Sequence, residues 1–304
     1  TLDEDNIDIL LESEILSATV GKMLIDMGGD VLVVPSTATV DVLVDEVAVN
    51  IVSKAEIKSA FLAVTALGIT DINDIEVDAS ILTNLATEAD STVLDTSKTG
   101  KIFSSEILHA TISDLLLDMT SGDNPVMVVP YTGFDDSEIR YIDTASSVEY
   151  VAQAELESVL AAVLVLDLSD FNNVDSLDLS LIIDNSTTIL DSAILHATIS
   201  DQLFDLGSDV ITIPYVAEDE TSIRVTKGGT GKETIYLAKS ELEAIFDALE
   251  IIGITDINTF DGTIDLEAIL ADDENVTTLL NSAVIHATVS EQMINLADDG
   301  TINI

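Results

Sequence analysis

One short pattern recurs along this chain, and it constrains the fold more than any other feature of the sequence. The pattern Ser-x-(Ile/Val)-(Leu/Ile)-His-Ala-Thr begins at Ser105, Ser192 and Ser282, and a more divergent copy begins at Ser13. These serines are separated by 92, 87 and 90 residues. Self-similarity at a fixed period is typical of units that bury their apolar faces against their neighbours. We therefore expect tandem repeats and not a single globular body.

The same pattern sets the repeat boundaries. Residues 1–12 read as the end of a preceding repeat, residues 13–104, 105–191 and 192–281 as three repeats, and residues 282–304 as the start of a fourth. Because the sequence opens without methionine, we expect a processed protein or a piece of a longer one. The final part-repeat is then completed either by further sequence or by another molecule, for which strand addition to an exposed sheet edge is the physical route.

Each repeat is predicted to be an α+β module: a helix, a three-stranded antiparallel meander, a second helix and a short third helix. In the opening helix of the second copy, Leu108, Ile112 and Leu115 share one face. The first predicted strand of each copy ends in proline, which suits a strand end or edge. The predicted strands are 31–35, 40–44 and 47–52, then 126–130, 139–142 and 148–151, then 210–214, 223–226 and 235–238.

The second helix of each repeat opens with an acidic residue, at Glu56, Glu155 and Glu241. Ser53 and Glu56 have the spacing of a capping box, in which the two residues cap one helix reciprocally. A polar loop then leads into a short helix, predicted at 79–86, 177–183 and 266–270, and a Ser/Thr/Asn-rich loop leads into the next copy. The modules are expected to form a linear array.

The charge of the chain excludes several classes of partner. Its 57 acidic and 10 basic residues give a net charge of −47, yet 47% of its residues are hydrophobic, so it can bury cores and is not a disordered acidic chain. Phosphate backbones and anionic lipids would be repelled, so we expect no nucleic-acid partner. No apolar run reaches the ~18 residues of a membrane span, so direct membrane insertion is not expected. Without cysteine there are neither disulfides nor thiolate metal sites.

Oxygen-rich loops between the second and third helices are candidate calcium sites. Calcium takes six to eight carboxylate, amide and carbonyl oxygens, and these loops are rich in them. None has the spacing of an EF-hand, and the competing interpretation is that these residues cap helices on an acidic surface. Calcium is the one cofactor that the sequence suggests. The candidates are Asp71, Asn73, Asp74 and Asp78, then Asp170, Asn172, Asp175 and Asp178, then Asp256, Asn258, Asp261 and Asp265.

Two other sets of residues recur with the repeat. His109, His196 and His286 occupy one position of the pattern, where Ser17 stands in the first copy. They are expected to pack or cap within the helices, because copies about 90 residues apart do not share a metal ion; a periodic metal ligand or pH sensor is the alternative. Asn185 and Asn275 begin aligned Asn-x-Thr sequons, which are candidate glycosylation sites or chance products of a polar loop.

No nucleophile elbow, phosphate loop, dinucleotide fingerprint or zinc-protease motif is present, and the sequence predicts no enzyme. In its repetition and acidic, cysteine-free composition, the chain resembles long repetitive surface proteins of bacteria or archaea. That resemblance implies an extracellular or cell-surface fibre, stalk or adhesive filament whose partners are further copies, end to end. The alternatives are a binding module that uses the variable segments 36–46, 131–147 and 215–234, and an intracellular scaffold of a salt-adapted organism.

Overall fold

The computed structural model describes residues 4–28, 32–44, 47–69, 83–118, 127–130, 139–166, 179–206, 210–214, 223–229, 232–254 and 273–298. The chain divides into two compact units. The first comprises Thr1–Pro125 and Thr132–Phe171, and the second comprises Val126–Tyr131 and Asn172–Ile304. Both mix helices with small sheets, as an α+β chain should.

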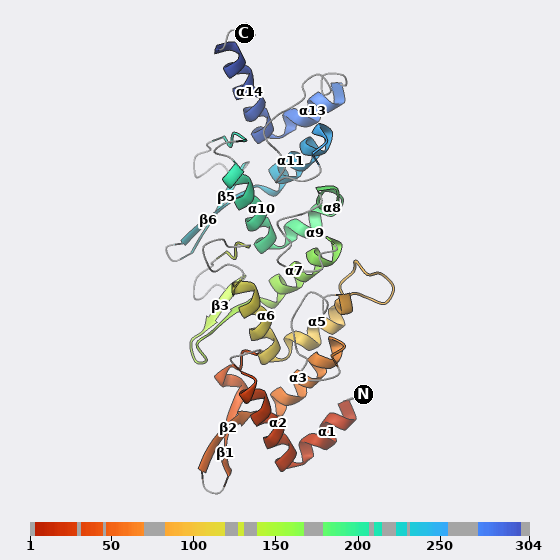
Figure 1. The fold of residues 1–304 in the computed structure, drawn as a ribbon, viewed down its shortest axis with the longest axis vertical. Coiled ribbons are helices and arrows are strands. Elements are labelled where there is room, and N and C mark those ends of the chain that lie inside the picture. Colours follow the sequence, from red (N-terminus) through yellow and green to blue (C-terminus); the bar gives the residue numbers. More distant parts are fainter. Residues whose placement is uncertain are drawn as a thin grey trace. The chain divides into compact units, whose positions relative to one another are not determined.

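The first unit holds the first copy of the repeat and most of the second (Figure 1). Each copy places an opening helix against a hairpin, and a second helix follows the hairpin directly. The elements are α1 (Glu4–Glu12), α2 (Glu14–Asp26), η1 (Ser36–Ala38), β1 (Thr39–Val44), β2 (Val47–Val52), α3 (Lys54–Ala66), η3 (Thr83–Leu85), α5 (Thr96–Phe103), α6 (Glu106–Asp118), β3 (Arg140–Asp143), β4 (Val148–Val151) and α7 (Gln153–Val165).

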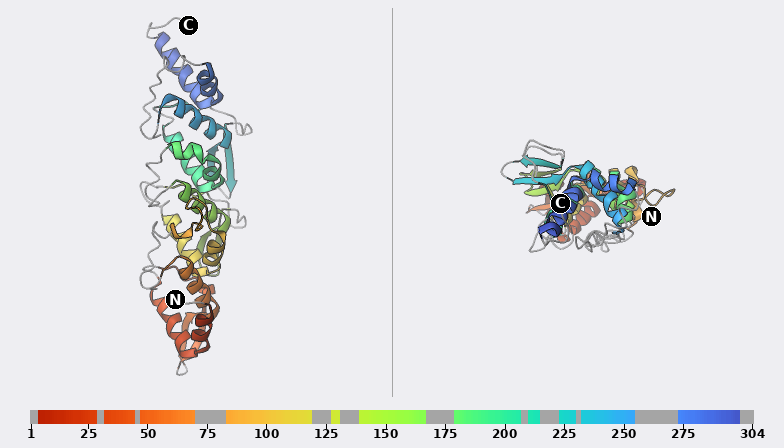
Figure 2. Two further views of the ribbon diagram at one scale, coloured as in Figure 1. Left: turned by 90° about the vertical axis from the view of Figure 1, so that its right-hand side faces the viewer. Right: turned by 90° about the horizontal axis from the view of Figure 1, so that it is seen from above.

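The second unit has the same order of elements, and its hairpin is the pair of teal arrows in the left panel of Figure 2. Its elements are α8 (Leu179–Asp184), α9 (Ser186–Asp191), α10 (Ala193–Leu206), β5 (Arg224–Gly229), β6 (Lys232–Leu237), α11 (Lys239–Ile252), α13 (Asp273–Asn281) and α14 (Ala283–Asp298). Helix α11 ends at Gly253, whose φ of 80° is the left-handed conformation that glycine adopts most readily. No helix in the described ranges has the length and hydropathy to cross a bilayer.

The sheets are two-stranded hairpins, and the predicted three-stranded meander is not present in the described residues. The second and third predicted strands pair antiparallel as β1–β2, β3–β4 and β5–β6. The described parts of the first predicted strands are 32–35, 127–130 and 210–214, which we call the linking segments. They join none of these sheets, and Leu32 makes only an isolated bridge with Gly28. The prediction failed because one backbone amide of each segment donates to a threonine hydroxyl on the next opening helix instead of to a strand.

Helices also stand where polar loops were expected before each new copy. Helices α5, α9 and α13 occupy these stretches, so the chain enters every opening helix from a preceding helix. Helix α1 precedes α2 in the same way. Polar side chains masked the pattern: α13 has only a few apolar residues, and one of them, Leu279, is buried. Of the predicted short helices, the described parts are η3 and α8.

Candidate functional site

The twelve calcium candidates, from Asp71 to Asp265, lie outside the described residues, and calcium binding therefore stays a prediction. Within the described residues no group of three or more His, Asp or Glu side chains could hold a metal ion. The sequon asparagines are described. Asn185 precedes α9 and donates its side-chain amide to the Leu181 carbonyl at 3.0 Å. Asn275 lies within α13, and both residues are half-buried instead of standing in open loops.

Two of the pattern histidines bind the backbone of their own hairpin. The His109 Nε2 atom lies 2.7 Å from the Val151 carbonyl oxygen at the end of β4, and the Ser113 hydroxyl accepts the Val151 amide at 3.0 Å. His196 and Ser200 hold Leu237 of β6 in the same way, at 2.6 and 3.2 Å. One turn of the opening helix thus satisfies both backbone groups of one strand residue. His286, on α14, is exposed.

The first copy joins its helix and hairpin by another route. Ser17 and Gly21 stand where later copies have histidine and serine. A Cβ atom on Gly21 would lie 2.8 Å from the Val52 carbonyl oxygen, closer than real side chains approach a backbone. The missing side chain lets helix and strand approach each other directly, so no bridging hydrogen bond is needed. Glycine is required here by close packing and not by a turn.

The surroundings of His109 favour the neutral form of the ring. Burial lowers the pKa of His109, and the hydrogen bond to Val151 opposes this in part. Phe103 packs edge-on against the imidazole, with ring centroids 5.6 Å apart, and Tyr150 lies 5.1 Å away. Burial also raises the pKa of Tyr150 to about 12. The Val151 carbonyl oxygen can only accept, so Nε2 carries the hydrogen in this contact.

The acidic residues of two second helices, Glu56 and Glu241, reach the next copy. Glu56, on α3, is buried, and its carboxylate accepts hydrogen bonds from the Ser105 hydroxyl at 2.6 Å and from the Glu106 and Ile107 amides at 3.2 and 3.0 Å. Ser105 accepts the Leu108 amide at 3.2 Å. Glu56 therefore caps α6, where free amides and the helix dipole both favour an anion. Burial is the largest influence on the pKa of Glu56 and raises it, although the hydrogen bonds oppose the shift.

The junction between the third and fourth copies repeats this geometry. Glu241, on α11, accepts from the Ser282 hydroxyl at 2.8 Å and from the Ala283 and Val284 amides at 3.2 and 3.0 Å. The Ser282 hydroxyl in turn accepts the Ile285 amide at 3.1 Å. At both of these junctions the glutamate thus caps the following copy's opening helix and not its own.

The predicted capping box is therefore only half formed. Ser53 does accept the Glu56 amide, at 3.2 Å, but the Ser53 amide bonds to the Ala38 carbonyl at 2.8 Å. The Glu56 carboxylate is engaged with α6 instead. The later copies have alanine at the position of Ser53 and retain the glutamate. Retention of the acid without its capping partner is the sequence signal that could have revealed the longer-range role.

The linking segments supply a second contact between copies. The Val33 amide donates to the Thr111 hydroxyl on α6 at 3.0 Å, a residue 78 positions later. The Val128 amide donates to Thr198 at 2.9 Å, and the Thr212 amide donates to Thr288 at 2.8 Å. Each threonine is buried and donates its own hydrogen to a carbonyl one turn earlier in its helix. The residue before each donor is a buried apolar anchor: Leu32, Met127 and Ile211.

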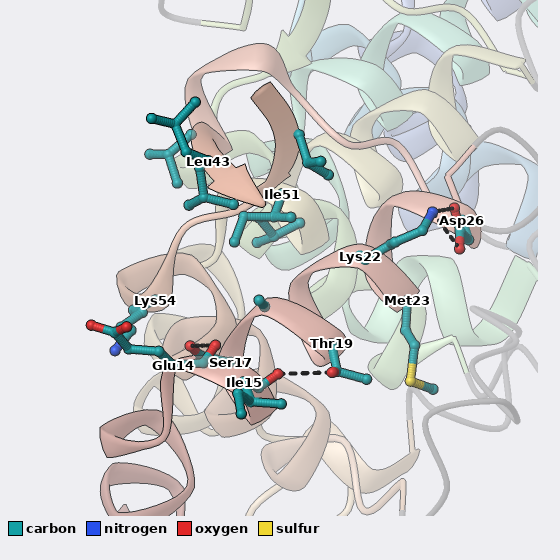
Figure 3. Close-up of a pocket in the computed structure, with 15 residues that line it drawn as sticks. Glu14, Ile15, Ser17, Thr19, Lys22, Met23, Asp26, Leu43, Ile51 and Lys54 are labelled. Atoms are coloured by element: carbon teal, nitrogen blue, oxygen red, sulfur yellow. Dashed lines mark hydrogen bonds and ion pairs between the residues drawn. The ribbon is translucent and has the colours of Figure 1, made fainter. Parts of the chain in front are cut away.

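The opening helix of the first copy carries the same acceptor face, and none of the linking segments in the described residues covers it. Helix α2 and the hairpin β1–β2 line an open groove of about 910 Å³ (Figure 3). Ile15 is 79% exposed and Leu16 is 50% exposed, and Thr19 donates to the Ile15 carbonyl at 2.7 Å while its hydroxyl stays exposed. Residues at the two apolar positions in later copies are 0–1% exposed: Ile107, Leu108, Ile194, Leu195, Val284 and Ile285.

No protein-family model, curated protein or solved structure matches this chain. The residues that join successive copies are thus identified by their geometry alone. They are a glutamate that caps the next opening helix, a threonine on that helix, and a linking segment whose amide the threonine accepts. Of these, the sequence had marked the acid only as a feature of its own helix and the linking segments only as strands.

Proposed function

We propose that this chain is a structural repeat protein whose copies of about 90 residues join end to end in a linear array. The array would serve as an extracellular or cell-surface fibre, stalk or adhesive filament and would catalyse no reaction. Its partners would be further copies of the repeat. Stabilisation of the inter-helix loops by divalent cations belongs to the same proposal.

The observation that carries this proposal is the recurrence of one junction chemistry. The amide–threonine contact occurs three times along the described chain, and the glutamate cap is described at two junctions. Each contact joins residues of successive copies and buries polar groups that would be costly to leave unpaired. Repeats that interact only with their nearest neighbours form quasi-one-dimensional assemblies, and identical junctions allow indefinite extension.

The charge of the chain supports the same proposal. A net charge of −47 repels neighbouring molecules that approach side by side, which favours separate filaments over sheets or clumps. The junctions instead bury apolar side chains and hydrogen bonds at the ends of each copy. End contacts are therefore attractive where lateral contacts are repulsive.

Solution scattering tests the array directly. A compact globule of this length would have a radius of gyration of about 19 Å, and one further copy would raise it by roughly 10%. A linear array would have a larger radius, and duplication of residues 192–281 would raise it by roughly 30%, in proportion to length. A radius near the compact value in both chains would contradict the proposal. Antibody labelling of intact source cells, compared with lysed cells, tests the surface location.

A further inference from the structure

Two junctions between copies carry, beside the shared contacts, a hydrogen bond between side chains. At the first junction Thr37, which follows the linking segment, donates its hydroxyl hydrogen to the Glu106 carboxylate of α6 at 2.6 Å. At the third junction Thr212 of the linking segment donates to the Glu291 carboxylate of α14. Both glutamates are exposed, so these contacts lie at the edge of the junction. We call Thr37–Glu106 and Thr212–Glu291 the edge pairs.

The two edge pairs use different positions of the repeat. Residues 105–114 and 282–291 align without a gap, and Ala283 then stands at the position of Glu106. The acceptor of the first edge pair is therefore missing from α14. A threonine placed as Thr37 is would find no oxygen on the Ala283 side chain.

The position of Glu291 changes together with its partner in the linking segment. Glutamate on the helix accompanies threonine in the segment, and aspartate accompanies valine. The combinations are Thr212 with Glu291, Val33 with Asp114, and Val128 with Asp201. In the described part of the chain no hydrogen bond lowers the pKa of either aspartate, which burial and a neighbouring aspartate raise. The hydrogen bond thus occurs where both residues differ from those of the other junctions.

We propose that the edge pairs determine which copies of the repeat can be neighbours, so that the copies join in a fixed order. This inference rests on the proposed array and deepens it by naming the residues that select each neighbour. The glutamate cap and the amide–threonine contact use residues that the copies share, so these contacts hold any two copies together without distinguishing between them. The edge pairs use residues that differ between copies, and specificity is a difference in affinity between right and wrong partners.

A wrong neighbour loses an edge pair in either direction. The first copy on α14 would place Thr37 opposite an alanine and Val33 beside the Glu291 carboxylate. The third copy on α6 would place Thr212 opposite Asp114, whose side chain is one methylene shorter than that of Glu291. A hydrogen bond to a charged group changes an equilibrium constant by about tenfold, which ranks neighbours while the shared contacts still hold the junction.

An exchange of edge residues on the full chain tests the selection. One half-exchange combines Val33→Thr with Thr37→Val in the first copy. The other combines Glu106→Ala with Asp114→Glu on α6, which gives this helix the edge residues of α14. Hydrogen exchange of the residue 33 amide, which donates to Thr111, reports opening of the junction.

Each half-exchange should lower the protection factor of this amide about tenfold, because it removes the first edge pair and supplies only half of another. All four changes together create the third junction's pair in the first junction and should restore protection to within about threefold of the unmodified chain. Full protection in both half-exchanges, or a combined variant no better protected than the half-exchanges, would overturn the proposal.

Thr39→Val is the matched control for the first junction. The Thr39 hydroxyl donates to the Ser36 carbonyl at 2.9 Å, a contact within one copy, two residues from Thr37. Its loss should leave the protection of the residue 33 amide unchanged. A loss of protection equal to that of Thr37→Val would show a general effect of removing a hydroxyl here and would refute the role of the edge pair.

A double-mutant cycle tests the third junction. Thr212→Val and Glu291→Asp should each lower the protection of the residue 212 amide about tenfold, and both changes together should lower it no further, because they remove the same hydrogen bond. Independent, multiplying effects would contradict a direct pair. The scattering test of the array does not depend on which copies are neighbours, so the array and the selection of neighbours can fail separately.

Discussion

Replacement of Glu241 by glutamine tests the glutamate cap that joins successive copies. The Glu241 carboxylate holds three donors, the hydroxyl of Ser282 and the amides of Ala283 and Val284. Glutamine keeps the size of the side chain but has one acceptor oxygen and one amino group. In its better orientation the oxygen keeps the bonds to Ser282 and Val284, and the amino group then faces the Ala283 amide.

The expected cost follows from these contacts. One hydrogen bond is lost and leaves a donor unpaired, at about 1–3 kcal/mol, and two charge-assisted bonds become neutral bonds that are worth about half as much. Loss of the anion at the helix terminus costs a further ~0.3–1 kcal/mol. Relief of the buried charge offsets part of this sum. We expect a net loss of about 2–3 kcal/mol in the free energy of unfolding of the second unit.

Thermal unfolding followed by circular dichroism measures the effect, which corresponds to roughly 5–10 °C for a unit of this size. Hydrogen exchange at the amides of residues 283–285 gives a local readout, where protection should fall first. Glu243→Gln is the matched control, since Glu243 is exposed on the same helix, two residues away, and should change stability by less than about 0.5 kcal/mol. Equal melting temperatures and equal protection in the two variants would refute the capping role.

Three further predictions concern two glycines, one histidine and the net charge of the chain. Gly21→Ala should destabilise the first unit by about 2 kcal/mol or more, because the new Cβ atom would overlap the Val52 carbonyl oxygen. Gly100→Ala is the control: nothing lies within 4 Å of its Cβ position, and the change should stabilise α5 by about 0.5–1 kcal/mol. Urea unfolding of the two variants measures both effects. The pKa of His109 is lowered in the fold, so its contribution to the free energy of unfolding is present above about pH 6.5 and is lost as the pH falls through the folded pKa. His109→Gln should therefore reduce the difference in the free energy of unfolding between about pH 7.5 and about pH 5.5. An unchanged difference would show that His109 does not cause the pH dependence. Raising NaCl from about 0.02 to 0.5 M should raise the melting temperature, because salt screens the net charge of −47. A chelator at low salt should lower the melting temperature only if the inter-helix loops bind calcium. A melting temperature that responds to neither change would show that neither charge screening nor calcium stabilises the fold.

The sequence by itself determined the local structure and its recurrence. The apolar spacing of the opening helices predicted α6 and α10, and the β-branched runs predicted the strands of the hairpins. Both predictions were possible because the periodicities of helices and strands depend only on residues close in sequence. Helices α5 and α13 escaped this reading, since few apolar residues mark their buried faces. The linking segments also looked like strands, because a β-branched run does not reveal which group its amides will bind.

Only the tertiary structure decided what joins one copy to the next. Glu56 and Ser105 are 49 residues apart, and Val33 and Thr111 are 78 residues apart, so no local pattern connects them. A buried carboxylate is stable there only because a helix N-terminus from the following copy supplies its donors. Ile15 is exposed whereas Ile107 and Ile194 are buried, and this difference could not be predicted because the sequence around the three residues is nearly the same. What differs at these positions is the neighbour that covers them, which only the folded chain specifies.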